Sequence, residues 1–263
     1  MFKTRLISGI VLVAAALILL IFGGIPLAVV CLGLSLIGMT ELYRACGIMT
    51  GKKLNPLVIV SFICAIAWYA ALFFGNEKTY LPVLIASLMA IMCVYVCSYP
   101  KYKSEDVISA YFGLIYVAVM LSFIFQTRQL ESGKILCWLI ILSAWGSDTF
   151  AYCTGMLIGK HKMAPVLSPK KSIEGAVGGV VGAAVLGVVY ALVFGQPPIE
   201  YGIICIFGAL ISMVGDLAAS AIKRNRGIKD YGTLIPGHGG VLDRFDSIIF
   251  TAPVIYYLAY FIL

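Results

Sequence analysis

The chain has 263 residues, of which 62% are hydrophobic and only 12% are charged, and its mean hydropathy is +1.03. Because ordinary soluble domains carry about a quarter of charged residues, this composition excludes a soluble globular protein and indicates an integral membrane protein. The formal net charge of +7 does not indicate nucleic-acid binding, since no basic stripe alternates with aromatic residues. It indicates contact with anionic lipid head groups and phosphates.

Apolar runs long enough to cross a bilayer as helices, roughly 20 residues each, follow one another along the chain. We expect an all-α integral membrane protein with about nine transmembrane helices, at residues 6–22, 25–46, 55–74, 79–99, 104–126, 134–158, 173–194, 200–222 and 244–262. The Gly-Gly-x-Pro break between the first two spans predicts a tight helical hairpin. The expected organisation is a single polytopic membrane domain, residues 1–263, with N-terminal helices over about 1–130 and catalytic helices and loops over about 134–263.

The distribution of basic residues predicts the orientation. Lys3 and Arg5 precede an apolar stretch that is longer than the core of a signal peptide and lacks a cleavage site, so we expect a retained first helix. Sixteen of the 19 lysines and arginines fall on the side of the N-terminus, and only Lys78, Arg128 and Lys134 fall on the other. The positive-inside rule then places the N-terminus and the connections 159–172 and 223–243 in the cytoplasm and the C-terminus outside. The expected location is the inner (cytoplasmic) membrane of the cell.

Among the acids of the expected spans, Asp148 and Asp216 qualify as candidate intramembrane carboxylates. A charge at the centre of a membrane helix costs about 2.5–3.5 kcal/mol on insertion scales, so such residues are candidates for function. Ser212, Asp216, Ser220 and Lys223 follow one another at helical spacing and therefore share one face of the eighth span. They form a polar stripe that descends from a basic loop.

The segment before the last span, Lys229 to Asp246, is rich in glycine and charge. Glycines around His238 allow the backbone to approach a ligand closely, and Asp243 and Asp246 stand at the start of the ninth helix. Two interpretations are open for these acids. They are helix caps, or they are ligands of a magnesium-bound polyphosphate, which the second carboxylate on the eighth helix favours.

The connection before the seventh span is also suited to an anion. It carries two serines and four lysines, Lys160, Lys162, Lys170 and Lys171. It also leads into a helix N-terminus, where backbone N–H groups bind anions. The lysines are either substrate contacts or lipid anchors. The seventh span itself contains Gly175, Gly178, Gly179 and Gly182. This pattern predicts close helix contact, and we favour contact within the chain over contact between two copies.

Two motifs resemble those of a known family. The sequence S-x-I-K-R-x4-K-D-x-G-x2-I-P-x-H-G-G-V-x-D-R-F-D at Ser220–Asp246 resembles the signature of phosphatidate cytidylyltransferases, also called CDP-diglyceride synthases, and S-P-K-K-S-x-E-G at Ser168–Gly175 resembles a second stretch of that family. The similarity extends over the whole chain. It implies transfer of CMP from CTP to phosphatidate, which gives CDP-diacylglycerol and pyrophosphate, with Mg²⁺, in an all-helical membrane homodimer.

The resemblance also implies roles for individual residues. It assigns magnesium to Asp216 and Asp243, a supporting role to Asp246, and the phosphates or pyrophosphate to Lys223, Arg224, Lys229 and His238. The catalytic set is then Asp216, Asp243, Lys223, Arg224 and Asp246. The remaining expected substrate contacts are Ser168, Lys170, Lys171, Ser172, Glu174, Ser220, Arg244 and Asp148.

Two other functions remain open. A CTP-dependent polyprenol or dolichol kinase would use related chemistry but transfer the γ-phosphoryl group. A membrane transporter would also explain intramembrane acids and broken helices, although the sequence shows no internal repeat.

Overall fold

The computed structural model describes residues 16–49, 51, 54–235 and 239–263. The chain divides into two compact units. Unit 1 comprises Met1–Phe125 together with Ile228–Arg244, and unit 2 comprises Gln126–Gly227 together with Phe245–Leu263. Ile228–Arg244, which makes up most of the motif Ser220–Asp246, therefore belongs to the same unit as the N-terminal helices. The single membrane domain expected from the sequence stays a prediction.

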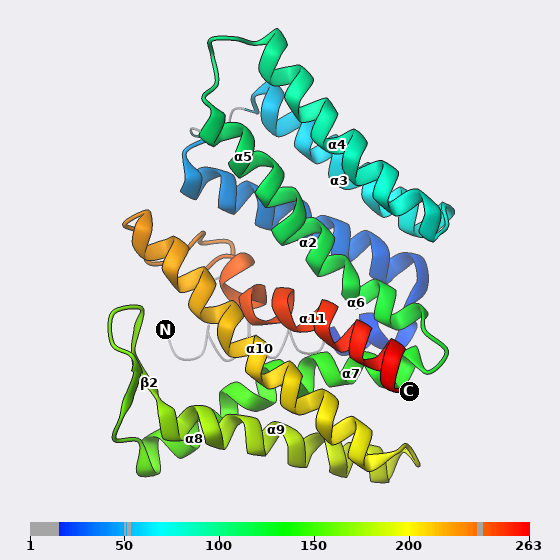
Figure 1. Ribbon diagram of the computed structural model, residues 1–263, viewed down its shortest axis with the longest axis vertical. Helices are drawn as coiled ribbons and strands as arrows, with labels where there is room; N and C mark the ends of the chain where they lie inside the picture. The colour runs from blue at the N-terminus through cyan, green and yellow to red at the C-terminus, as the bar shows by residue number, and fades with distance from the viewer. Residues whose placement is uncertain (1–15, 50, 52–53, 236–238) are drawn as a thin grey trace. The chain divides into compact units, whose positions relative to one another are not determined.

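Unit 1 is built from helices that begin and end at recognisable signals. Residues 16–22 are helical, Gly23 follows with a positive φ of 63°, and α2 (Gly24–Cys46) ends at Gly47 in the left-handed conformation. Helix α3 (Pro56–Phe74) is capped by the side chain of Asn55, and α4 (Glu77–Cys97) by that of Asn76. These two helices lie side by side in Figure 1.

Among the described residues, the fourth long helix is interrupted by a π-helix. It consists of α5 (Ser104–Gly113), η1 (Leu114–Val119) and α6 (Met120–Gln129), the last of which runs into unit 2. Within unit 1, α2 packs against α3, α5 and η1. The Tyr43 hydroxyl of α2 donates a 2.7 Å hydrogen bond to the Ala110 carbonyl of α5, which ties these two helices together.

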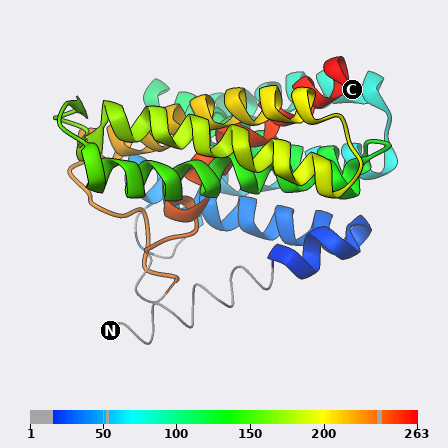
Figure 2. The same ribbon diagram turned by 90° about the horizontal axis from the view of Figure 1, so that it is seen from below.

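Unit 2 contains the second π-helix and a small β-hairpin. Its elements are α7 (Gly133–Ile141), η2 (Leu142–Gly146), α8 (Ser147–Ile158), β1 (Lys162–Ala164), β2 (Ser168–Ser172), α9 (Ile173–Val193), α10 (Pro198–Asn225) and most of α11 (Leu242–Ile262). Figure 2 shows α9 running alongside the long helix that α7, η2 and α8 form together. The expected 159–172 connection is therefore an antiparallel hairpin, with Lys162 opposite Ser172 and Ala164 opposite Ser168.

The glycines of α9 account for its close packing. A Cβ atom at Gly179 would come within 2.8 Å of the Ser147 carbonyl oxygen, and one at Gly178 would collide with the side chain of Thr154. Gly182 is equally close to Phe150 on the same neighbouring helix. The expectation that these glycines serve helix packing within the chain is confirmed, because all of these contacts are made with α8.

Eight helices in the described part of the chain are long and apolar enough to cross a membrane, and they match eight of the nine expected spans. They are Gly24–Cys46, Pro56–Phe74, Glu77–Cys97, Ser104–Gln129, Gly133–Ile158, Ile173–Val193, Pro198–Asn225 and Leu242–Ile262. The expected break after residue 22 is confirmed. The first expected span, with Lys3 and Arg5, lies largely outside the described residues, and the orientation of the termini stays a prediction.

Candidate active site

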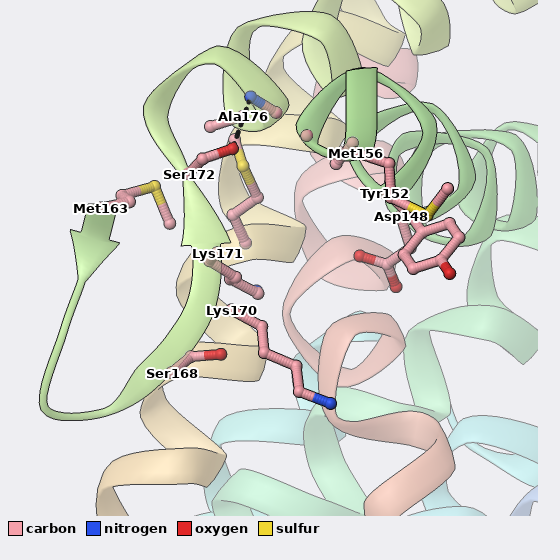
Figure 3. A pocket seen from close by; sticks show the side chains of 13 residues that line it. Asp148, Tyr152, Met156, Met163, Ser168, Lys170, Lys171, Ser172 and Ala176 are labelled. Atoms are coloured by element: carbon pink, nitrogen blue, oxygen red, sulfur yellow. Dashed lines mark hydrogen bonds between the residues drawn. The ribbon is translucent and has the colours of Figure 1, made fainter. Parts of the chain in front are cut away.

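A cavity of about 460 Å³ lies in unit 2 between the hairpin and α8. Figure 3 shows Ser168, Lys170 and Lys171 extending from β2, and Asp148 and Tyr152 extending from α8. Met156, Met163 and Met213 supply much of its apolar lining. The volume lies in the range of small-molecule sites, and the lining combines cationic groups with an apolar wall. Such a cavity suits an anionic ligand with an apolar part.

The central electrostatic contact of this region is an ion pair between Lys171 of β2 and Asp216 of α10. The two side chains are 24% and 29% exposed, so the pair is only partly shielded from solvent. The Ser220 hydroxyl, one turn along α10, lies 3.5 Å from Asp216 Oδ1. Three residues that the sequence assigned to the site are therefore neighbours in the structure.

Two further carboxylates lie within electrostatic range of Asp216. Asp148 interacts with both Asp216 and Lys171, and Asp246 interacts with Asp216, Asp148 and Lys223. Asp246 is brought there by tight helix packing, because a Cβ atom at Gly215 would come within 2.8 Å of its carbonyl oxygen. Unit 2 thus gathers three aspartates and two lysines from β2, α8, α10 and α11.

The π-helix η2 stands directly before the helix that carries Asp148. A π-bulge inserts a residue into the helical repeat and changes the direction in which the following side chains project, and such bulges are frequent at functional sites. Here η2 ends at Gly146, and Asp148 lies in the first turn of α8. The sequence carries no signal for this feature, because a π-bulge leaves the hydropathy of a span unchanged.

Two predicted substrate contacts hold the hairpin in place. Glu174 accepts hydrogen bonds from the backbone N–H groups of Lys160 and His161, at 3.1 and 3.2 Å, and its carboxylate lies 2.6 Å from His161 Nδ1. The Ser172 hydroxyl caps α9 by accepting a hydrogen bond from the Gly175 N–H. These bonds fix both ends of the loop that presents Lys170 and Lys171.

The basic residues at the end of α10 differ in exposure. Lys223 is half-buried and Arg224 is exposed, and both stand in the last turn of the helix. Cations in this position are favoured by the negative end of the helix dipole. Lys223 also interacts with Asp246. It therefore lies beside the aspartate cluster, which consists of Asp148, Asp216 and Asp246.

In unit 1, Asp243 organises the segment that precedes it. Its Oδ2 atom accepts hydrogen bonds from the backbone N–H of Tyr231, at 2.8 Å, and from that of Gly240, at 3.0 Å. The side chain is buried, while Lys229 and Arg244 of the same segment are exposed. His238 lies outside the described residues, so its predicted role stays a prediction.

The N-terminus of α11 is capped by a residue that lies outside both sequence motifs. Glu41 of α2 accepts hydrogen bonds from the backbone N–H groups of Val241 and Leu242, at 3.0 and 2.8 Å. Capping was one of the two interpretations of the acids at this helix start. In the structure Glu41, an acid from a distant helix, provides part of that capping. Asp243 itself bonds to the preceding loop.

Comparison with known proteins identifies the family. Residues 3–262 match the model of the cytidylyltransferase family. The chain belongs to the cytidylyltransferase family. It is 29% identical over 267 residues to the phosphatidate cytidylyltransferase of Bacillus subtilis (strain 168), with 97% of each chain covered. It is 32% identical over 261 residues to the proteins of the same name from Staphylococcus saprophyticus and Staphylococcus aureus (strain COL), with 96% of this chain and 97% of each relative covered.

A cytidylyltransferase handles polyphosphates, and the aspartate cluster fits the metal that such substrates usually carry. No three His, Cys, Asp or Glu side chains form a metal-binding group among the residues that the structure describes. Magnesium in proteins is commonly held by one or two carboxylates, with waters and substrate phosphates as its other ligands. Asp148, Asp216 and Asp246 supply carboxylate oxygens that lie within electrostatic range of one another. The donor set therefore fits a hard divalent cation.

Proposed function

We propose that this cytidylyltransferase transfers CMP from CTP to phosphatidate and forms CDP-diacylglycerol and pyrophosphate. The proposal rests on the cationic cavity beside the membrane-spanning helices, in a chain whose relatives carry the name phosphatidate cytidylyltransferase over nearly their full length. A phosphomonoester lipid has an anionic head and an apolar body. Lys170 and Lys171 suit the head, and the methionines and Tyr152 suit apolar groups next to it.

The reaction needs no covalent intermediate with the protein. A phosphate oxygen of phosphatidate attacks the α-phosphorus of CTP in line, the bond from that phosphorus to the bridging oxygen breaks, and pyrophosphate leaves with the electron pair. The nucleophile is already an anion, so no base has to remove a proton. The obstacles are the repulsion between two anions and their alignment.

The side chains of unit 2 address both obstacles. Lys171 is held by Asp216, which fixes the ammonium group at one wall of the cavity. Lys170 adds a second positive charge from the same strand. In this proposal the two lysines bind the lipid phosphate, and Lys223 and Arg224 stabilise the departing pyrophosphate. A preorganised cation costs no reorganisation when negative charge moves during the reaction.

Asp216 and Asp243 keep the proposed role of magnesium ligands, and Asp246 that of a supporting carboxylate. When bound, the ion would neutralise the charge of the polyphosphate and polarise its oxygens. The other substrate-binding assignments, to Ser168, Ser172, Glu174, Ser220, Lys229, His238, Arg244 and Asp148, are kept as part of the proposal. So are the homodimer, the contact with membrane lipids and the position of the active site at the cytoplasmic face of the membrane.

A labelling experiment distinguishes this function from the alternatives. The purified protein is given phosphatidate, magnesium and CTP that carries the label in either the α- or the γ-phosphate. Label from the α position in the lipid extract supports CMP transfer. Label from the γ position would show a lipid kinase instead, and label from neither position would contradict both activities and leave a transporter or another role.

A further inference from the structure

Glu41 is a buried carboxylate of unit 1 whose hydrogen bonds reach a segment 200 residues away. Its side chain lies in α2 with 4% of the residue exposed. Both of its oxygens are used: Oε1 accepts from Val241 and Oε2 from Leu242. These two N–H groups stand at the start of α11, where backbone donors have no partner within the helix. The positive end of the helix dipole adds to the attraction.

Two glycines of the long motif make room for this carboxylate. A Cβ atom at Gly232 would collide with Oε1 of Glu41, and one at Gly240 would come within 2.6 Å of its Cδ atom. Gly232 does not need glycine for its backbone angles, since its φ lies outside the left-handed region. The motif is therefore shaped around a residue that it does not contain.

Glu41 and Asp243 hold the same short segment from opposite ends. Asp243 bonds to the N–H of Tyr231 and Gly240, and Glu41 bonds to the two N–H groups that follow Gly240. Three consecutive backbone donors thus point at two carboxylates. Removing the acceptor from a buried donor costs more than an average hydrogen bond contributes. Loss of Glu41 must therefore loosen the turn that places Asp243.

We infer that Glu41 is a positioning residue for CMP transfer. It touches no proposed substrate group; it fixes the turn Gly239–Leu242, and through that turn it fixes the carboxylate of Asp243. The inference rests on the proposed function and extends it to a residue of the N-terminal helices. A purely structural Glu41 would contribute to the stability of unit 1 without influencing how the enzyme responds to magnesium.

The test compares Glu41→Gln and Glu41→Ala with wild type, as full-length protein purified in detergent. Gln keeps one acceptor oxygen but loses the charge, so we expect kcat to fall by about tenfold or more in Glu41→Gln and further in Glu41→Ala. The magnesium concentration for half-maximal rate should rise in both variants, because Asp243 is less well placed. Hydrogen exchange of the Tyr231, Gly240, Val241 and Leu242 amides should also be faster, a readout that needs neither substrate nor metal.

Ser35→Ala is the matched control. Ser35 is fully buried in the same helix, and its hydroxyl lies 3.0 Å from the Tyr69 hydroxyl. Its hydrogen-bond partners, Cys31 and Tyr69, lie outside the motif. This variant should lose thermal stability while its magnesium response and the exchange of the same four amides stay as in wild type. A Glu41→Gln enzyme that behaves like Ser35→Ala in these two measurements would overturn the inference.

A double-mutant cycle approaches the same contact from its other side. Gly232→Ala should displace the Glu41 carboxylate and reproduce the low kcat and the raised magnesium requirement. When Glu41→Ala is added, the collision is absent, so the two effects should be clearly less than additive. Wild-type kinetics in a folded Gly232→Ala would also overturn the inference. If wild type itself transfers no CMP, the proposed function fails and the inference falls with it, whereas an active wild type with unaffected variants refutes the inference alone.

Discussion

Replacing Asp243 by asparagine separates a catalytic carboxylate from a merely structural one. The amide oxygen of asparagine has the size and direction of the Oδ2 atom that accepts from Tyr231 and Gly240. Both hydrogen bonds can therefore form in the variant. What is lost is the negative charge, which the proposed role in binding magnesium requires and which only strengthens the two hydrogen bonds that hold the loop.

The expected effects differ in size. Hydrogen bonds to a charged acceptor contribute about 1 kcal/mol more than neutral ones, so the two bonds predict that the free energy of unfolding falls by about 2 kcal/mol. If Asp243 binds the magnesium ion of the reacting polyphosphate, loss of its charge should raise the activation barrier by about 3–5 kcal/mol. This corresponds to a rate loss of about 10²–10⁴. The loss of activity thus exceeds anything that the loss of stability explains at a temperature where the variant is folded.

The assay measures α-labelled CMP that enters the lipid extract, at several magnesium concentrations, beside thermal unfolding of the same preparation. Asp106→Asn is the control, since Asp106 caps α5 by accepting from the Lys103 N–H at 2.9 Å. It should cost stability and leave transfer unchanged. Near-normal turnover of folded Asp243→Asn at low magnesium would refute the reasoning, because Asp243 would then serve the loop alone.

Three further outcomes follow from the structure. Lys171→Ala should reduce CMP transfer at least about 100-fold, since it removes a phosphate contact and leaves a carboxylate unpaired; activity within twofold of wild type would contradict the proposed role. Gly178→Ala should destabilise the protein by about 1–3 kcal/mol in thermal or denaturant unfolding, and Thr154→Ala should restore part of that loss, whereas additive effects would show that the two helices do not meet there. In a background without the eight native cysteines, Lys170→Cys should be protected from impermeant thiol reagents in intact cells and Lys78→Cys should be labelled; the reverse pattern would invert the predicted orientation.

Several parts of the site were predictable because they depend on local sequence. Asp216 and Ser220 share a face of α10 by helical spacing, and the structure places them together. The lysines of the 159–172 connection were expected to present charge, and Lys170 and Lys171 line the cavity. The glycines of α9 signalled close packing, although only the structure shows that α8 is the neighbour.

Other parts depend on contacts that no local pattern records. Hydropathy reports the length and polarity of a helix, so it predicted all eight spans that the structure describes. It gave no sign of η1 or η2, because these π-helices alter only the hydrogen-bond register. The hairpin likewise had no strand pattern in the sequence, since its two strands are only three and five residues long and irregularly paired.

Local sequence is enough to predict the class of this protein, its described spans and the residue types of its site. Burial of apolar runs in a bilayer is a local energetic requirement, and carboxylates and lysines carry the same chemistry wherever they fold. Which of these residues meet depends on how the chain folds in three dimensions. The Lys171–Asp216 pair joins a strand to a helix, and Glu41 reaches Val241 and Leu242 across 200 residues. A buried carboxylate needs donors close in space, and the chain supplies them from segments that are distant in sequence.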